Sequence, residues 1–173
     1  MKTILTEIDN WFLTKSAEMD TFARNDTRVE GWFKGEMLVL LDQLKRKDVI
    51  LDYRREPNFY RGNKRYQVDF EIKIESEKHL VEIKAPCISQ AHGTPRNLNF
   101  YFREDDIGLI KDFRKLNLAN NPNRWLLAFI YPKPRKQAWR VAMTKVPSDV
   151  SNWHCVTRLN NYPEYLFVSL WKG

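Results

Sequence analysis

The sequence Tyr66-Gln-Val-Asp-Phe-Glu-Ile-Lys-Ile74, followed after a short polar turn by His79-Leu-Val-Glu-Ile-Lys84, decides the expected fold of this chain. Both runs are rich in β-branched and aromatic residues, and both alternate apolar with polar side chains. This is the pattern of half-buried strands, in which successive side chains point to opposite faces. The sequence therefore predicts two neighbouring strands, each with one apolar and one polar face.

The polar faces of the two predicted strands are expected to meet. If Ser76-Glu77 form a two-residue turn, Asp69 pairs with Lys84, and Glu71 pairs with Glu82. Residues that lie directly opposite each other share a face of the sheet, with Cβ atoms roughly 5 Å apart. Carboxylates and one ammonium group are thus predicted to gather on a single patch.

The spacing of these residues suits a divalent metal ion. Mg²⁺ prefers oxygen ligands and usually takes only one or two carboxylates, which leaves room for water and phosphate. Asp69 and Glu82 offer carboxylates, and the backbone carbonyl of Ile83 offers a further oxygen. Lys84 points to the same side as Glu82, where it would orient or deprotonate an attacking water. The metal would lower the pKa of that water and neutralise charge on phosphoryl oxygens.

An acid on one strand and Glu-x-Lys on the next resemble the PD-(D/E)xK nuclease superfamily, which includes type II restriction endonucleases and Holliday-junction resolvases. The match covers Asp69 and Glu82-Ile83-Lys84, with twelve residues between the two acids, and Val68 stands where the motif's name has Pro. The resemblance implies a metal-dependent endonuclease that hydrolyses phosphodiester bonds. It implies Mg²⁺ as the cofactor, with Mn²⁺ able to replace it, and Asp69, Glu82 and Lys84 as catalytic residues.

Two other interpretations of the strands remain open. The motif also occurs as Glu71-Ile72-Lys73, with Asp52 upstream as its acid. We favour residues 82–84 because they lie on the third strand of the run and their acid partner follows from a tight hairpin. The second alternative is a ladder of surface salt bridges without catalytic function, each worth only about 0.2–1 kcal/mol.

A third acid is expected from the segment before the strands. Residues 28–46 are predicted to form an amphipathic helix, and Glu36 falls inside its apolar stripe, three residues after Phe33 and four before Leu40. A carboxylate in a buried stripe is costly unless it is paired or bound to a metal. Similar nucleases often carry an acid on this helix, so the resemblance assigns Glu36 to the metal site, with Glu30 as the alternative. Otherwise Glu36 would reach solvent or pair with Lys34 or Arg65.

The order of the predicted elements agrees with the resemblance. The prediction has one or two helices in residues 4–24, a helix at 28–46, a strand at 49–54, the two motif strands, a helix at 105–117, and strands at 124–131, 138–144 and 165–171. This gives an α/β fold with a restriction-endonuclease-like αβββαβ core, in which a mixed central sheet is flanked by helices. We expect a single domain over residues 1–173, with residues 1–27 as an N-terminal helical extension.

The composition is compatible with an intracellular, nucleic-acid-binding enzyme. The formal charge of the 173 residues is +7, which favours a polyanionic partner. No apolar run approaches the length of a membrane span, so we expect no membrane association and a cytoplasmic location. The candidates for contacts with nucleic acid are Arg54, Arg55, Arg61, Lys64, Arg65, Arg96, Lys133, Arg135 and Lys136.

The substrate and assembly are predicted by analogy. Gln90, in the loop after Lys84, is the candidate for a supporting residue at the site. Viral RNA endonucleases of similar motif would be expected to carry a His in the upstream helix, and no His precedes His79, so DNA is favoured over RNA. A restriction or resolvase role would favour a homodimer. The alternative is a non-catalytic nucleic-acid-binding or assembly subunit that retains the fold.

Overall fold

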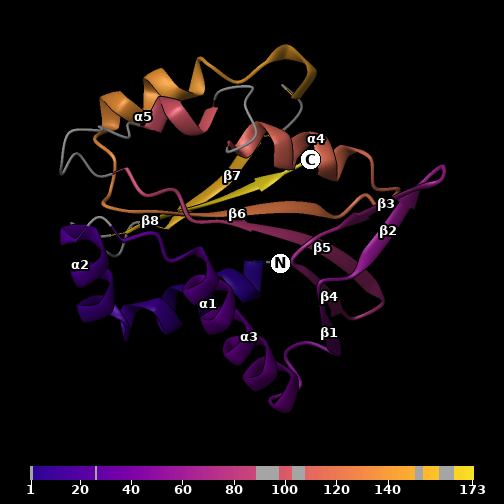
Figure 1. The fold of residues 1–173 in the computed structure, drawn as a ribbon. Helices are drawn as coiled ribbons and strands as arrows, with labels where there is room; N and C mark the ends of the chain where they lie inside the picture. The colour runs from indigo at the N-terminus through magenta and orange to yellow at the C-terminus, as the bar shows by residue number, and fades with distance from the viewer. Residues whose placement is uncertain (1, 26, 89–97, 103–107, 151–153, 160–165) are drawn as a thin grey trace.

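The central feature of the computed structural model is a six-stranded sheet in the order β1-β4-β5-β6-β8-β7 (Figure 1). The structure describes residues 2–25, 27–88, 98–102, 108–150, 154–159 and 166–173. Only β5 and β6 are parallel, and the other neighbouring strands are antiparallel. The strands are β1 (Asp52–Arg55), β4 (Phe70–Ile74), β5 (Glu77–Lys84), β6 (Arg124–Ile130), β7 (His154–Leu159) and β8 (Phe167–Lys172).

Three N-terminal helices cover one face of the sheet: α1 (Lys2–Leu13), α2 (Ser16–Arg24) and α3 (Glu30–Arg46). Their apolar stripes pack against the sheet, and the rings of Phe33 and Phe129 stack with centroids 4.5 Å apart. Helices α1 and α2 contribute fully buried side chains such as Phe12 and Met19. Residues 2–24 therefore form part of the main core.

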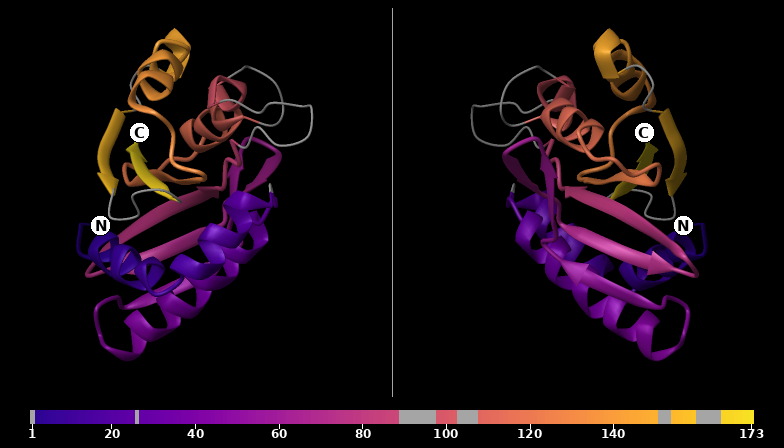
Figure 2. Two further views of the ribbon diagram at one scale, coloured as in Figure 1. Left: turned by 90° about the vertical axis from the view of Figure 1, so that its left-hand side faces the viewer. Right: turned by 90° about the vertical axis from the view of Figure 1, so that its right-hand side faces the viewer.

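The opposite face is covered by η1 (Leu98–Phe102), α4 (Leu109–Asn117) and α5 (Lys136–Met143), with the short turn η2 (Ser148–Val150) near α4. The side views show the two groups of helices on opposite sides of the sheet (Figure 2). Strand β6 is buried on both faces. Leu127 lies in the core under α1, α2 and α3, and Leu126 and Ala128 lie in the core under η1, α4 and α5. This explains its nearly continuous apolar sequence.

A separate hairpin projects from the edge of this body on the side of α4 (Figure 1). Its strands, β2 (Asn58–Arg61) and β3 (Lys64–Gln67), pair only with each other and form a two-stranded sheet. The turn between them contains Gly62, whose φ of 57° lies in the left-handed region that glycine adopts without a steric penalty. The hairpin leaves the sheet after β1 and returns at β4.

The predicted α/β class, with a mixed central sheet flanked by helices, is confirmed. The elements α3, β1, β4, β5, α4 and β6 follow one another in the order αβββαβ, and the β2–β3 hairpin is inserted between β1 and β4. Helix α3 and strand β8 match the helix predicted at 28–46 and the strand predicted at 165–171. None of the helices in the described part of the chain has the length and apolar character that a membrane crossing requires.

One predicted strand is wrong and another is interrupted. Residues 138–144 lie in α5 rather than in a strand, and Trp139 and Ala142, spaced three apart, form its buried face. Ala, Arg, Lys and Met favour a helix, which overrides a short apolar run. The single strand predicted at 66–74 is interrupted at Val68-Asp69, where the chain turns from the hairpin into the main sheet.

The pairing of the motif strands also differs from the prediction. The turn is Glu75-Ser76, so that Ile74 pairs with Glu77 and the register shifts by two residues. The expected pairs of Asp69 with Lys84 and of Glu71 with Glu82 are therefore wrong, since Glu71 lies opposite Leu80. A shift of two leaves every side chain on its predicted face, so alternation alone could not distinguish the two turns.

Candidate active site

The buried carboxylate of Glu82 lies at the centre of the candidate site. Strand β5 places Glu82 on the face of the sheet that α4 covers, and the residue is only 6% exposed. Lys115, on α4, lies 2.6 Å from Glu82 Oε1 through its Nζ. The other oxygen, Oε2, is buried and has no hydrogen-bond partner within the described structure. Glu82 thus holds one lone-pair-bearing oxygen that a further cation or donor would satisfy.

Asp69 reaches the same place from the bend that precedes β4. Its Oδ2 accepts a hydrogen bond of 2.7 Å from the backbone N–H of Ile83, and Lys34 Nζ lies 2.8 Å from its Oδ1. In a strand, the N–H and C=O of one residue point to the same side. The Ile83 carbonyl therefore faces the edge where Asp69 lies, as the predicted ligand set requires.

Helix α3 contributes Glu30 to this region rather than Glu36. Glu30 lies 2.9 Å from Lys34 Nζ and 3.8 Å from Lys84 Nζ. Glu36 instead accepts a hydrogen bond from Trp11 Nε1 at 2.9 Å and pairs with Lys15 at 3.3 Å, both contributed by the N-terminal helical segment. Six residues are about 1.7 helical turns, so the two acids point in different directions. Glu36 therefore lies apart from the other predicted site residues, whereas the alternative, Glu30, lies among them.

Helix α4 supplies an acid that the sequence interpretation missed. Asp112 is 7% exposed and lies 3.2 Å from Lys84 Nζ and 3.8 Å from Lys115 Nζ. The signal was present, because Asp112 lies three residues after Leu109 and four before Leu116, both fully buried. A carboxylate within a buried apolar stripe must be paired or bound to a metal. This applies to Asp112 as it does to Glu36, and Asp112 is paired with Lys84 and Lys115.

These contacts join seven side chains from both helical layers and the sheet. We call them the carboxylate–lysine cluster: Glu30, Lys34, Asp69, Glu82, Lys84, Asp112 and Lys115. With every group ionised, four carboxylates face three ammonium groups, so the cluster carries a formal charge of −1. Lys84 bridges the two layers, because it contacts Glu30 on α3 and Asp112 on α4.

Burial and crowding of like charges perturb the acids. Burial, reinforced by Asp69 and Asp112, raises the pKa of Glu82 to about 7. Burial also raises the pKa of Asp112, although Lys84 and Lys115 oppose the shift. For Lys84, burial lowers the pKa, but Asp112 and Glu30 more than compensate and the pKa is raised. Lys84 therefore stays protonated, whereas the pKa of Glu82 lies close to neutral pH.

The donor set fits a small divalent cation in its chemistry. Asp69, Glu82 and the Ile83 carbonyl are oxygen donors, and Mg²⁺ usually takes one or two carboxylates. The unsatisfied Oε2 of Glu82 and the negative formal charge also favour a cation. Within the described residues, however, no three His, Cys, Asp or Glu side chains are gathered closely enough to hold a metal ion. Lys34 and Lys115 occupy one oxygen of each acid, so an entering ion would displace these contacts.

The second motif does not assemble a comparable site. Asp52 pairs with Lys73 across β1 and β4, but its side chain is half exposed and bound to Lys45 at 2.6 Å. Glu71 pairs with Lys78 at 3.6 Å, and Ile72 between the motif's charged residues is fully buried. These contacts are those of a salt-bridged surface.

The predicted nucleic-acid contacts lie in two places. Arg54 and Arg55 end β1, and Arg61, Lys64 and Arg65 lie on the β2–β3 hairpin. All five are exposed. Lys133, Arg135 and Lys136 lie between β6 and the start of α5. Gln90 and Arg96 lie outside the described residues.

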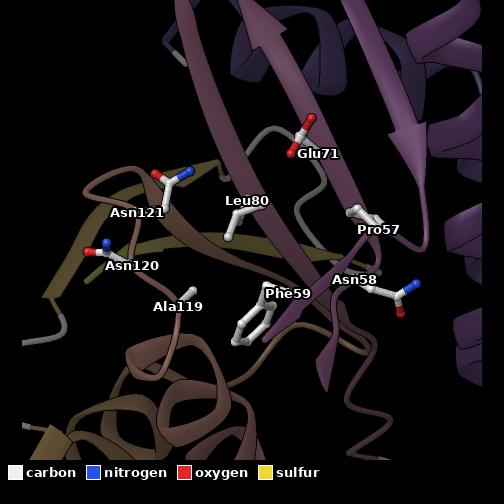
Figure 3. Close-up of a pocket in the computed structure, with 8 residues that line it drawn as sticks. All are labelled: Pro57, Asn58, Phe59, Glu71, Leu80, Ala119, Asn120 and Asn121. Atoms are coloured by element: carbon white, nitrogen blue, oxygen red, sulfur yellow. The ribbon is translucent and has the colours of Figure 1, made fainter. Parts of the chain in front are cut away.

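A pocket lies between the base of the β2–β3 hairpin, the sheet and the segment that follows α4 (Figure 3). The start of the hairpin (Pro57–Phe59), Glu71 and Leu80 of the sheet, and the segment Ala119–Asn121 line it. Leu80 precedes Glu82 by two residues on the same face of β5, which corresponds to about 7 Å along the strand. The base of the hairpin is therefore next to the carboxylate–lysine cluster.

Comparison with known proteins identifies no relative: no family model, curated protein or solved structure matches this chain. The interpretation of the site therefore depends on its own geometry and chemistry.

Proposed function

We propose that this protein is a metal-dependent endonuclease that hydrolyses phosphodiester bonds, with DNA favoured over RNA. The observation that carries the proposal is the convergence of Asp69, Glu82 and Lys84 at the place where β4 begins and β5 ends. The restriction-endonuclease-like arrangement of the αβββαβ core belongs to the same proposal. It is supported by the order of elements and by the parallel pairing of β5 with β6.

Each residue of the site has a role that follows from its position. Asp69, Glu82 and the Ile83 carbonyl would hold Mg²⁺ or Mn²⁺, and Glu30 takes the place first assigned to Glu36. The ion would supply Lewis-acid activation of a water and neutralisation of phosphoryl charge. Asp69 is held in position by the Ile83 N–H, which fixes one of its oxygens and leaves the other toward Lys34.

Lys84 acts as a cation in this proposal. Since Asp112 and Glu30 keep its pKa raised, it would orient the attacking water or contact a phosphoryl oxygen as an ammonium group. Its two carboxylate partners come from opposite helical layers and restrict its position. Two roles were considered for Lys84: to orient the attacking water or to remove a proton from it. Because Lys84 stays protonated, the first role has more support.

The first test is calorimetric titration of the protein with Mg²⁺, Mn²⁺ and Ca²⁺. The wild type should bind, and Asp69→Asn should weaken binding at least tenfold, because asparagine keeps an acceptor for the Ile83 N–H but loses the charge. Cleavage of plasmid DNA with Mg²⁺ or Mn²⁺ should be lost in Lys84→Ala. Lys78→Ala, on the same strand but with an exposed side chain, is the matched control. Equal trace cleavage by all these proteins would refute the proposal.

The ion pairs that Lys34 and Lys115 make with the site's acids favour a second candidate function. Because Lys34 and Lys115 already neutralise Asp69 and Glu82, the cluster also fits a non-catalytic nucleic-acid-binding subunit whose charges only hold the layers together. This candidate predicts salt-sensitive binding of nucleic acid that does not respond to divalent ions or to Asp69→Asn.

A further inference from the structure

The β2–β3 hairpin has two chemically different faces. In the observed register, Phe59 pairs with Tyr66, and their rings stack with centroids 5.3 Å apart. Phe59 also packs against the core on the α4 side. Residues that pair directly share a face, so this face anchors the hairpin to the body of the protein.

The other face carries only polar side chains and one tyrosine: Asn58, Tyr60, Arg65 and Gln67. All four residues are exposed, and Tyr60 is 68% exposed. Arg65 donates through Nε to Asn58 Oδ1 at 2.9 Å, a bond that orients the guanidinium without using its two terminal nitrogens. Arg, Asn and Gln are the side chains that recognise base edges through paired hydrogen bonds.

The charge of this element matches a polyanion. Residues 54–67 contain five basic side chains and one acidic one, so their formal charge of +4 is more than half of the chain's +7. The basic residues Arg61 and Lys64 flank the turn at the tip, while Arg54 and Arg55 lie near its base. An arm of this kind would contact phosphates on both sides of a groove.

We propose that the β2–β3 hairpin is a DNA-reading arm that enters the major groove of a duplex with its Asn58–Tyr60–Arg65–Gln67 face. The major groove of B-form DNA admits a two-stranded β-ribbon, whereas that of A-form RNA is too deep and narrow for side chains to read. Glu56, at the base of the arm, donates its backbone N–H to the Asp69 carbonyl at 2.8 Å, so a duplex held by the arm would lie next to the carboxylate–lysine cluster. This inference names the substrate class and therefore rests on the proposed function.

The test is fluorescence-anisotropy binding of short DNA duplexes, RNA duplexes and single strands without divalent ions, so that no cleavage occurs. Arg65→Ala should weaken binding to duplex DNA about tenfold or more, as expected for the loss of a bidentate base contact. Tyr60→Ala is a second variant on the same face. Arg24→Ala removes the same charge from exposed α2 and should have a much smaller effect. A major-groove ligand should compete with the wild type better than a minor-groove ligand does.

The outcomes separate this inference from the proposed function. If Arg65→Ala and Arg24→Ala weaken binding equally, or if the hairpin variants affect RNA duplexes or single strands as much as duplex DNA, the reading arm is refuted. In that case cleavage by the wild type would leave the nuclease proposal standing. If Arg65→Ala loses duplex binding, and the wild type cleaves DNA with neither Mg²⁺ nor Mn²⁺, the reading arm is supported and the nuclease proposal is refuted.

Discussion

Replacing Glu82 with Gln should stabilise the protein at neutral and alkaline pH. Glu82 is 6% exposed, and its pKa is raised from 4.5 to about 7 chiefly by burial. Between these values the folded state holds a proton that the unfolded state has released, so stability falls as pH rises through this window. At about 1.4 kcal/mol per pH unit, the full cost above pH 7 is about 3 kcal/mol. Glutamine removes the ionisation and keeps the shape.

The assay is thermal unfolding between about pH 4 and about pH 8 without divalent ions. For a chain of this size, about 3 kcal/mol corresponds to a rise of about 6–12 °C in the melting temperature of Glu82→Gln relative to wild type at the upper pH. The difference should nearly vanish at the lower pH. Glu75→Gln, at the exposed turn of the same hairpin, is the control and should follow the wild type. Parallel curves for Glu82→Gln and wild type would refute the reasoning.

Three further predictions concern α3 and the core. Glu30→Gln should weaken Mg²⁺ binding measured by calorimetry, whereas Glu36→Gln should not; the reverse order would restore Glu36 to the site. Tyr131→Phe should lower the free energy of unfolding in urea by about 1–3 kcal/mol, because the Tyr131 hydroxyl donates to the Thr27 carbonyl and accepts from the Val29 N–H, and a loss below about 0.5 kcal/mol would contradict this. Phe129→Ala should cost about 3–5 kcal/mol in the same assay, and a smaller loss would mean that the core collapses around the cavity.

Alternation of side chains was enough to predict which residues of β4 and β5 share a face. It could not fix the register, because Glu75-Ser76 and Ser76-Glu77 are equally polar turns that lead to the same faces. Nor did it reveal the hairpin, because the apolar residues on both sides of Asp69 look continuous in the sequence although Val68 and Phe70 lie in different cores. The direction of the chain at such a bend depends on tertiary contacts.

The acids of the site were predictable to different degrees. Glu82 follows from the strand pattern, since its neighbours fix its face. Glu36 and Asp112 show the same sequence signal, a carboxylate within an apolar helical stripe, yet they end in different surroundings. The stripe reports burial, but it does not say which element lies opposite. For Glu36 that element is α1, whose Trp11 satisfies the carboxylate, and for Asp112 it is β5 with Lys84.

The energetics of the cluster favour a role beyond stability. Burying charged groups costs several kcal/mol for each ion, and a buried ionic network is often no more stable than apolar packing of the same volume. Among the residues that the structure describes, the network is also incomplete, because Glu82 Oε2 lacks a partner and the acids outnumber the lysines. The deficit of positive charge is met at low pH by a proton on Glu82. At neutral pH, where that proton is half lost, a divalent cation between Asp69 and Glu82 would meet the same need.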